Sequence, residues 1–224
     1  MSLILNIETS TKNCSVSLSE FGSVIALKQI NDGKYSHNEN LHSFIVAILK
    51  EADKKIDELE AVAISKGPGS YTGLRIGVSA AKGLCFSLDI PLISISTLQS
   101  LGLQVQVEDA YIVSMLDARR MEVYSAVYDE KNVLVREIRA EILEENSFEE
   151  FLNKKTVYFI GDGVEKTKVL ISHKNAVFID DKLPTANEMV QLAYAKFQQK
   201  DFEDMAYFEP FYLKDFVVTT NKKK

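Results

Sequence analysis

The sequence predicts an α/β fold with two lobes, each built on a mixed sheet with helices, because three features occur in order along the chain. Three short β-rich runs come first and are joined by tight connections, as in an antiparallel meander. Strand and helix patterns then alternate, which predicts parallel strands joined by a helical crossover. A polar stretch separates these elements from a second β-rich segment. The 224 residues are enough for two lobes of about 100 residues each.

The first lobe is expected to span residues 1–103. After the meander, apolar residues recur at helical spacing and predict a helix from about residue 36 to 54. Ser36 is the expected N-cap of this helix, and Glu39 completes a capping box. The meander strands are expected at 3–9, 13–19 and 24–30, and the later elements are a strand at 61–65, a helix at 71–87 and a strand at 91–95.

The second lobe is expected to span residues 104–224, after a polar stretch near residues 102–109. Thr185 is the expected N-cap of a final helix at 186–198. The three lysines at 222–224 are expected to form a solvated end of the chain. The other expected elements are strands at 111–116, 122–128, 133–143 and 157–160 and a short helix at 147–153.

Composition and charge narrow the function classes. The apolar fraction of 46% is ordinary for a globular protein, and no run approaches the ~18 apolar residues of a membrane span. The first residues lack the basic region of a signal peptide, so we expect the protein in the cytoplasm. A net charge of −6 argues against a protein that binds nucleic acid alone, so any RNA role is expected to be shared with a partner. Cys14 and Cys85 are expected to be buried, reduced thiols.

The segment Lys66–Gly77, with the sequence KGPGSYTGLRIG, is the densest group of glycines in the chain. Its glycines lie between an expected strand and an expected helix, where backbone amides can bind an anion. The segment lacks the Gly-Lys-Ser/Thr ending of a P-loop, and its spacing is not that of a dinucleotide fingerprint. A phosphate cradle is therefore one of two interpretations.

The other interpretation is a helix face that another backbone approaches closely. Gly73, Gly77 and Ala81 recur every four residues, with Ala80 alongside. Glycine inside a helix is less favourable than alanine by about 0.5–1 kcal/mol, so two of them need a compensating contact. The spacing does not tell a helix of the same chain from a helix of a second subunit. We favour a second subunit, and so expect Gly77→Leu to leave the chain folded but to abolish partner binding.

The same segment resembles the signature of the TsaB/YeaZ family and of its catalytic paralogue TsaD. Further matches are spread over nearly the whole chain, and the combination is more specific than any one of them. These matches are IETS at 7–10, SHNE at 36–39, DARRMEVY at 117–124, GDG at 161–163 and PFYL at 210–213.

The resemblance implies an actin-like fold (the architecture of sugar kinases, Hsp70 and actin) and a non-catalytic role. Members pair with TsaD and assemble with the ATPase TsaE into a complex that transfers a threonylcarbamoyl group to an adenosine of tRNA. We expect a homodimer in isolation, contact with tRNA only through the complex, and no cofactor.

Two sets of candidate residues follow. A carboxylate with hydroxyls after the first strand could hold a hydrated cation or an adenylate, or it could satisfy turn amides between strands. The expected partner interface comprises Ser36, His37, Gly73, Arg75, Gly77, Ala80 and Ala81. The possible nucleotide-binding residues are Glu8, Thr9, Ser10, Gly67, Gly69, Ser70 and Thr72.

The metal site of the catalytic paralogue can be compared residue by residue. The resemblance implies that TsaD-like enzymes hold a metal with a His-x-x-x-His pair after a Pro-Leu strand. The matching positions here are Thr97 and Leu101, so we expect no metal site and no catalytic residue. His37 and His42 are about 140° apart around a helix and do not readily share an ion. For these two and for His173 we expect capping, surface or interface roles.

Other functions remain as alternatives. TsaD-like proteins have been described as glycoproteases, but a metal-dependent hydrolase needs ligands that these residues do not supply. Ser70 does not lie in the Gly-x-Ser-x-Gly context of a nucleophile elbow. A stand-alone, homodimeric nucleotide-binding scaffold is compatible with all of these features. Arg75, Arg119 and Arg120 either meet a carboxylate or phosphate of a partner or pair within the chain.

Overall fold

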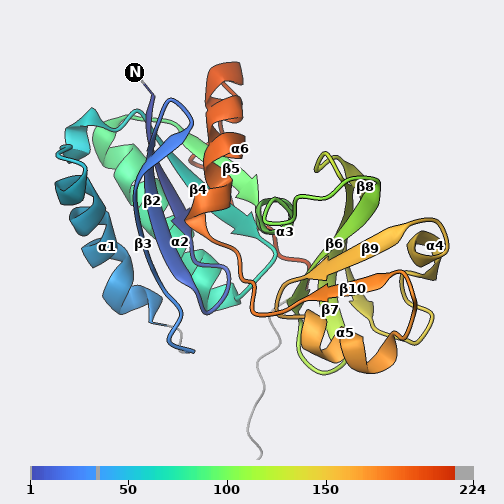
Figure 1. The fold of residues 1–224 in the computed structure, drawn as a ribbon. Helices are drawn as coiled ribbons and strands as arrows, with labels where there is room; N and C mark the ends of the chain where they lie inside the picture. Colours follow the sequence, from blue (N-terminus) through green and yellow to red (C-terminus); the bar gives the residue numbers. More distant parts are fainter. Residues whose placement is uncertain (1, 34–35, 215–224) are drawn as a thin grey trace, which may run out of the picture.

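A computed structural model describes residues 2–33 and 36–214 and shows two lobes, each with a five-stranded sheet (Figure 1). The expected solvated end at Lys222–Lys224 lies outside the described residues. Among those residues, no helix combines the length and the apolar character that crossing a membrane requires.

The first sheet combines an antiparallel meander with two parallel strands. Strands β1 (Leu3–Glu8), β2 (Cys14–Glu20) and β3 (Ser23–Ile30) form the meander, and β4 (Ala61–Gly67) and β5 (Leu92–Ser96) add to it in parallel. The strand order is β3-β2-β1-β4-β5. Both faces of β1 are covered, since all six of its residues are buried. The sheet therefore needs a covering layer on each side.

Helices cover both faces of this sheet. The α1 (His37–Glu51) and α2 (Tyr71–Leu88) helices pack on one face, where Leu5 belongs to the core that they share with the sheet. The α6 helix (Ala186–Gln199) packs on the other face, where Ile4 contributes. Successive side chains of a strand point to opposite faces, so these two neighbours serve different cores.

The second lobe repeats the strand order of the first. Its strands are β6 (Ala110–Asp117), β7 (Glu122–Asp129), β8 (Leu134–Ile142), β9 (Thr156–Ile160) and β10 (Ala176–Ile179). Their order is β10-β9-β6-β7-β8, again a meander with two parallel strands added beside its first strand. The two lobes therefore share one topology, and each is built on a mixed sheet with helices, as predicted.

Short helices complete the second lobe and the connection between the lobes. The α3 helix (Thr97–Gly102) follows β5 and leads into the second sheet, and a 3-10 turn, η1 (Ile56–Glu58), precedes β4. The helices α4 (Glu149–Leu152) and α5 (Val164–Leu170) lie beside the second sheet. Of these elements, α3, α5, η1 and β10 were not predicted from the sequence.

The C-terminal part of the chain returns to the first lobe. The α6 helix falls in the range assigned to the second lobe, but it packs against β1, β2 and β5. The segment after it also lies on the first lobe, where the Glu203 amide donates to the Leu92 carbonyl and the Phe211 amide to the Lys66 carbonyl. The predicted extent 104–224 is therefore wrong for this part, because the open apolar face of the first sheet must be covered.

The capping predictions had mixed outcomes. Thr185 caps α6, since its hydroxyl accepts from the Asn187 amide at 3.0 Å. Ser36 precedes α1 as predicted, but its side chain makes no capping hydrogen bond.

Cys14 and Cys85 are buried and unpaired as predicted, and burial raises the pKa of each thiol to about 11.

Candidate functional site

The Gly-rich segment connects β4 to α2 and lies directly against the turn after β1. Ser70 is the N-cap of α2, and its hydroxyl accepts a hydrogen bond from the Gly73 amide at 3.3 Å. This capping role satisfies one of the amides that a helix start leaves unpaired. Ser70 therefore begins a helix here.

The glycines allow the first turns of α2 to approach the β1 turn. Thr9 donates from its hydroxyl to the Gly73 carbonyl at 2.8 Å, and the Ser70 amide donates to the Ser10 carbonyl at 2.6 Å. A Cβ atom at Gly69 would lie 2.7 Å from the Ser10 Cβ, and one at Gly73 would overlap the Thr9 carbonyl oxygen. These positions require glycine because backbone meets backbone.

The small-residue face of α2 therefore contacts this chain and not a partner. Gly73, Gly77 and Ala81 are buried, and a Cβ atom at Gly77 would lie 2.9 Å from the Ile64 side chain. The prediction that these three residues form the partner interface is wrong. The approaching element is the β1 turn together with β4, which the four-residue spacing alone did not identify.

His37 is also an internal residue. It is 1% exposed at the start of α1, and its Nε2 atom lies 2.8 Å from the Thr11 carbonyl oxygen. Burial lowers the pKa of the His37 imidazole, although the Thr11 hydrogen bond acts in the opposite direction. The predicted interface role of His37 is wrong, because the ring fastens α1 to the β1–β2 connection.

The predicted nucleotide-binding residues do not form an open cradle. Glu8, Thr9 and Ser10 are each at most 1% exposed. The Gly67 amide donates to the Thr97 hydroxyl at 3.2 Å, and the Ser70 amide has the Ser10 carbonyl as its acceptor. The Gly67 and Ser70 amides are thus used inside the chain. Gly69 packs on Ser10 but is partly exposed, as is Ser70, and Thr72 is exposed.

Glu8 is the most enclosed carboxyl group of this region. Its Oε1 atom accepts from the Ser10 amide at 2.6 Å and from the Ser65 hydroxyl at 2.9 Å, and its Oε2 atom has no hydrogen-bond partner. Desolvation by burial raises the pKa of Glu8 above its ordinary value of 4.5, against the lowering effect of the Ser10 and Ser65 hydrogen bonds. The geometry agrees with the second interpretation of Glu8, in which its carboxylate accepts a hydrogen bond from a turn amide.

This buried carboxyl predicts a pH dependence of stability. A raised folded-state pKa means that the folded chain retains a proton which the unfolded chain has released, so Glu8 weakens the fold as pH rises above 4.5. We expect Glu8→Gln to gain stability over the unmodified chain by up to about 1.4 kcal/mol per pH unit in that window. Urea unfolding from pH 4.5 to 8 measures this difference.

The exposed Glu108 supplies the control for this experiment, since Glu108→Gln also removes one carboxylate. We expect this control variant to follow the pH profile of the unmodified chain. A Glu8→Gln difference that does not change with pH would contradict the role assigned to burial.

The outer face of α2 is open to solvent. Arg75 is exposed and lies over the Tyr71 ring at 4.1 Å, and its Nε atom donates to the Tyr212 hydroxyl at 3.2 Å. Gly83 has no atom within 4 Å of the position of a Cβ atom, and Phe86 is 79% exposed. Arg75 is thus the one residue of the predicted interface set that is fully exposed, with Ser36 and Ala80 half-buried.

The neighbouring helix adds to this open face. Val46 of α1 is 66% exposed, and α1 and α2 lie side by side on the same face of the first sheet (Figure 1). Sequence analysis did not select Val46, Gly83 or Phe86. They could have been noticed because each lies on the otherwise polar face of a predicted amphipathic helix. Apolar residues on such a face suggest that another surface covers them.

The two positions that match the metal ligands of TsaD-like enzymes are occupied here by buried residues. Thr97 and Leu101 of α3 are buried, and the Thr97 hydroxyl is the acceptor for the Gly67 amide. Leu101 lies in the core beneath the second sheet. Within the described ranges, no group of three or more His, Cys, Asp or Glu side chains is arranged to hold a metal ion.

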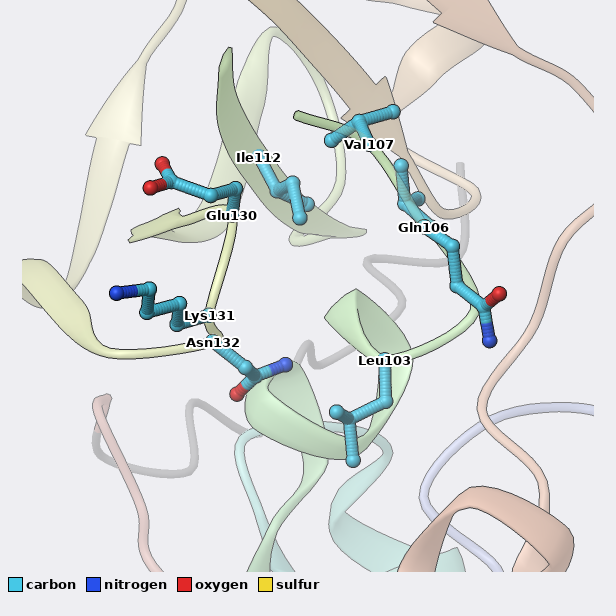
Figure 2. Close-up of a pocket in the computed structure, with 8 residues that line it drawn as sticks. Leu103, Gln106, Val107, Ile112, Glu130, Lys131 and Asn132 are labelled. Atoms are coloured by element: carbon cyan, nitrogen blue, oxygen red, sulfur yellow. The ribbon is translucent and has the colours of Figure 1, made fainter. Parts of the chain in front are cut away.

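A cavity of about 260 Å³ lies away from this region, at the start of the second lobe (Figure 2). Leu103, Val107 and Ile112 give it apolar walls, and the side chains of Glu130 and Lys131 extend outward from its edge. It lies between the connection that follows α3 and the turn between β7 and β8. None of the residues singled out from the sequence lines it.

Known proteins resemble this chain over most of its length. The profile of the family TsaD, tRNA N6-adenosine threonylcarbamoyltransferase, matches residues 31–222. The tRNA threonylcarbamoyladenosine biosynthesis protein TsaB of Bacillus subtilis is 37% identical over 135 residues, which are 60% of this chain and 58% of that protein. TsaB of Escherichia coli is 29% identical over 220 residues, which are 95% of this chain and 94% of that protein.

Solved structures agree with these relatives. A Pseudomonas aeruginosa protein described as similar to the peptidase YeaZ has 25% identity and a TM-score of 0.84, over 96% of this chain and 100% of that chain. YeaZ from Pseudomonas aeruginosa has 25% identity and a TM-score of 0.81, over 95% and 100% of the two chains. The chain therefore belongs to the TsaD family and, within it, to the TsaB/YeaZ group of tRNA threonylcarbamoyladenosine biosynthesis proteins with a two-lobed, actin-like fold.

Proposed function

We propose that this chain is a non-catalytic subunit that binds a TsaD-like catalytic protein through the outer face of α1 and α2. The observation that carries the proposal is the exposure of Val46 on α1 and of Gly83 and Phe86 on α2, two helices that contact each other. Large apolar side chains with exposures of 66% and 79% are typical of interaction surfaces, and an uncovered glycine allows a partner to approach closely. In isolation, a second copy of the chain would cover the same face.

The residues beneath that face support a binding role over a chemical one. Ser70 caps a helix, Glu8 bonds a turn amide and a serine hydroxyl, and Thr97 accepts from Gly67. These three side chains thus have structural tasks. A TsaE-like ATPase and tRNA would join the complex that this chain forms with the catalytic subunit.

Phe86→Asp tests the proposal directly. A carboxylate at this exposed position leaves the core untouched, but it would be desolvated at the centre of an apolar interface. We expect a loss of at least about 2 kcal/mol in affinity for the TsaD-like subunit, measured by calorimetry, and loss of co-elution in size-exclusion chromatography. In a reconstituted reaction the unmodified chain alone should transfer no threonylcarbamoyl group, and the variant should no longer support transfer by the catalytic subunit.

Val169→Asp is the matched control, because Val169 is 83% exposed on α5 of the other lobe. We expect this variant to bind the catalytic subunit as the unmodified chain does. Equal binding by a folded Phe86→Asp variant would refute the interface, and turnover by the purified chain alone would refute the non-catalytic role.

A further inference from the structure

The hairpin between β6 and β7 has an unfavourable backbone conformation at two adjacent arginines. Arg119 has a φ of 71° and Arg120 a φ of 52°, both in the left-handed region. The turn closes with a hydrogen bond from the Glu122 amide to the Arg119 carbonyl at 3.2 Å. Glycine and asparagine occupy such positions readily, whereas long side chains seldom do. Here two adjacent residues with long, charged side chains adopt it.

A lysine from another element holds this turn in place. Lys166 of α5 donates from its Nζ atom to Asp117 Oδ1 at 2.8 Å, to the Arg120 carbonyl at 2.9 Å and to the Glu122 carbonyl at 2.6 Å. Asp117 Oδ1 also accepts from the Arg119 amide at 2.5 Å. The turn is therefore fixed by side chains that reach its backbone, so the two arginines project from a rigid base.

The guanidinium groups of both arginines are left without an internal counter-ion. Arg119 and Arg120 are exposed, and in the part of the chain that the structure describes neither side chain makes a hydrogen bond or an ion pair. The carboxylates close to them are engaged elsewhere. Asp117 binds Lys166, Glu122 pairs with Lys214, and Asp162 accepts from the Asp117 amide at 2.8 Å.

Positive charge from separate parts of the chain gathers around the hairpin. Lys214, at the end of the C-terminal segment, reaches Glu122, and Lys166 lies beneath the turn. Lys12, from the β1–β2 connection of the other lobe, is close enough to oppose the burial that raises the pKa of Asp162. Asp117 and Glu122 pair with Lys166 and Lys214, so Arg119 and Arg120 are the cations left over at this turn, in a chain with a net charge of −6. That arrangement fits an anionic ligand at this turn.

We propose that Arg119 and Arg120 bind phosphate oxygens of an RNA backbone. The planar guanidinium group presents paired donors that match phosphate oxygens. The inference rests on the family's role in tRNA modification and not on the α1–α2 interface, which lies on the first lobe. Because two arginines of an acidic chain make the contact, we expect this chain by itself to bind RNA weakly and with a steep dependence on salt concentration.

The sharpest test replaces the arginines with residues that suit the turn. Arg119→Gly combined with Arg120→Asn relieves the left-handed backbone, so we expect a higher melting temperature. The same variant should bind a fluorescein-labelled tRNA transcript about tenfold more weakly at 50 mM KCl. The slope of log affinity against log salt should fall by about 1 for each phosphate contact removed. Fluorescence anisotropy with the full-length chain, from 50 to 200 mM KCl, measures both quantities.

Three comparisons isolate the site. Lys131→Ala with Lys174→Ala removes two exposed positive charges elsewhere on the second lobe and should leave RNA affinity nearly unchanged. Arg119→Lys with Arg120→Lys keeps the charge, so most of the salt dependence should remain while affinity falls by a smaller factor. ADP or inorganic phosphate at matched ionic strength should not displace the transcript, which distinguishes an RNA backbone from a small phosphate ligand.

Each contrary result overturns the proposal. These results are no RNA binding by the unmodified chain at 50 mM KCl, an equal loss of affinity in the Lys131→Ala, Lys174→Ala control, or displacement of the transcript by ADP or phosphate. Unchanged RNA binding by the Arg119→Gly, Arg120→Asn variant would also overturn it. If that variant instead loses the TsaD-like subunit and keeps RNA, the hairpin is a protein contact. Unchanged partner binding by a folded Phe86→Asp variant would refute the α1–α2 interface and leave the RNA result intact, so the two proposals fail separately.

Discussion

Gly73→Ala should lower the free energy of unfolding by about 3 kcal/mol, because one methyl group would separate two backbones that touch. The added Cβ atom would overlap the Thr9 carbonyl oxygen, which cannot rotate away as a side chain does. Moving α2 outward would break the hydrogen bond from the Thr9 hydroxyl to the Gly73 carbonyl and expose the core beneath it. Chemical denaturation followed by circular dichroism measures the loss.

Gly83→Ala is the matched control on the same helix. Gly83 has open space around it, so alanine should stabilise the helix by about 1 kcal/mol. Opposite signs for the same substitution on the two faces of α2 would establish which face is internal. Equal effects would contradict the packing described here. For the same reason Gly77→Leu, expected from the sequence to leave the chain folded, should unfold it.

Glu141→Leu should cost about 3 kcal/mol, because it leaves a buried guanidinium group without its counter-ion. Arg136 is 11% exposed, and its Nη2 atom donates to Glu141 Oε1 at 2.5 Å and to the Ser125 hydroxyl at 2.8 Å. Among the described residues its Nε and Nη1 atoms have no hydrogen-bond partner. Its guanidinium group lies over the Phe148 ring at 4.6 Å. Burial lowers the pKa of Arg136, an effect that Glu141 opposes. Removing this carboxylate withdraws the one strong compensation for the buried charge.

A double substitution shows whether the loss comes from the orphaned charge. Arg136→Met combined with Glu141→Leu replaces the pair with apolar side chains and should recover most of the stability. Asp109→Ala serves as the surface control, since Asp109 is 85% exposed in its pair with Lys155, and it should cost less than about 1 kcal/mol. A double variant as unstable as Glu141→Leu would contradict the explanation. Thermal and urea unfolding provide the comparison.

The nucleotide-binding prediction depended on which groups pair with the backbone amides of the Gly-rich segment. Glycines at a strand–helix junction suggest a phosphate cradle because helix amides there are unpaired in a local view. In the fold, the Thr97 hydroxyl and the Ser10 carbonyl take the Gly67 and Ser70 amides. These acceptors come from segments 30 and 60 residues away in the chain. Local sequence patterns therefore cannot predict these hydrogen-bond acceptors.

Features that depend on near neighbours and on residue identity could be predicted from the sequence. These include the meander, the β4–α2–β5 crossover, the Thr185 cap, the family signature, and the absence of histidine at Thr97 and Leu101. Hydrophobic periodicity and capping act over a few residues, so a single sequence displays them directly.

Only the tertiary structure decided which element covers each face. It turned the glycine face of α2 toward Thr9, placed α6 on the first sheet, and left Phe86 uncovered. It also left Arg119 and Arg120 without a side-chain partner among the residues that the structure describes. The physical reason is that periodicity marks a face as ready for packing, but what packs there depends on chain segments brought together from far apart.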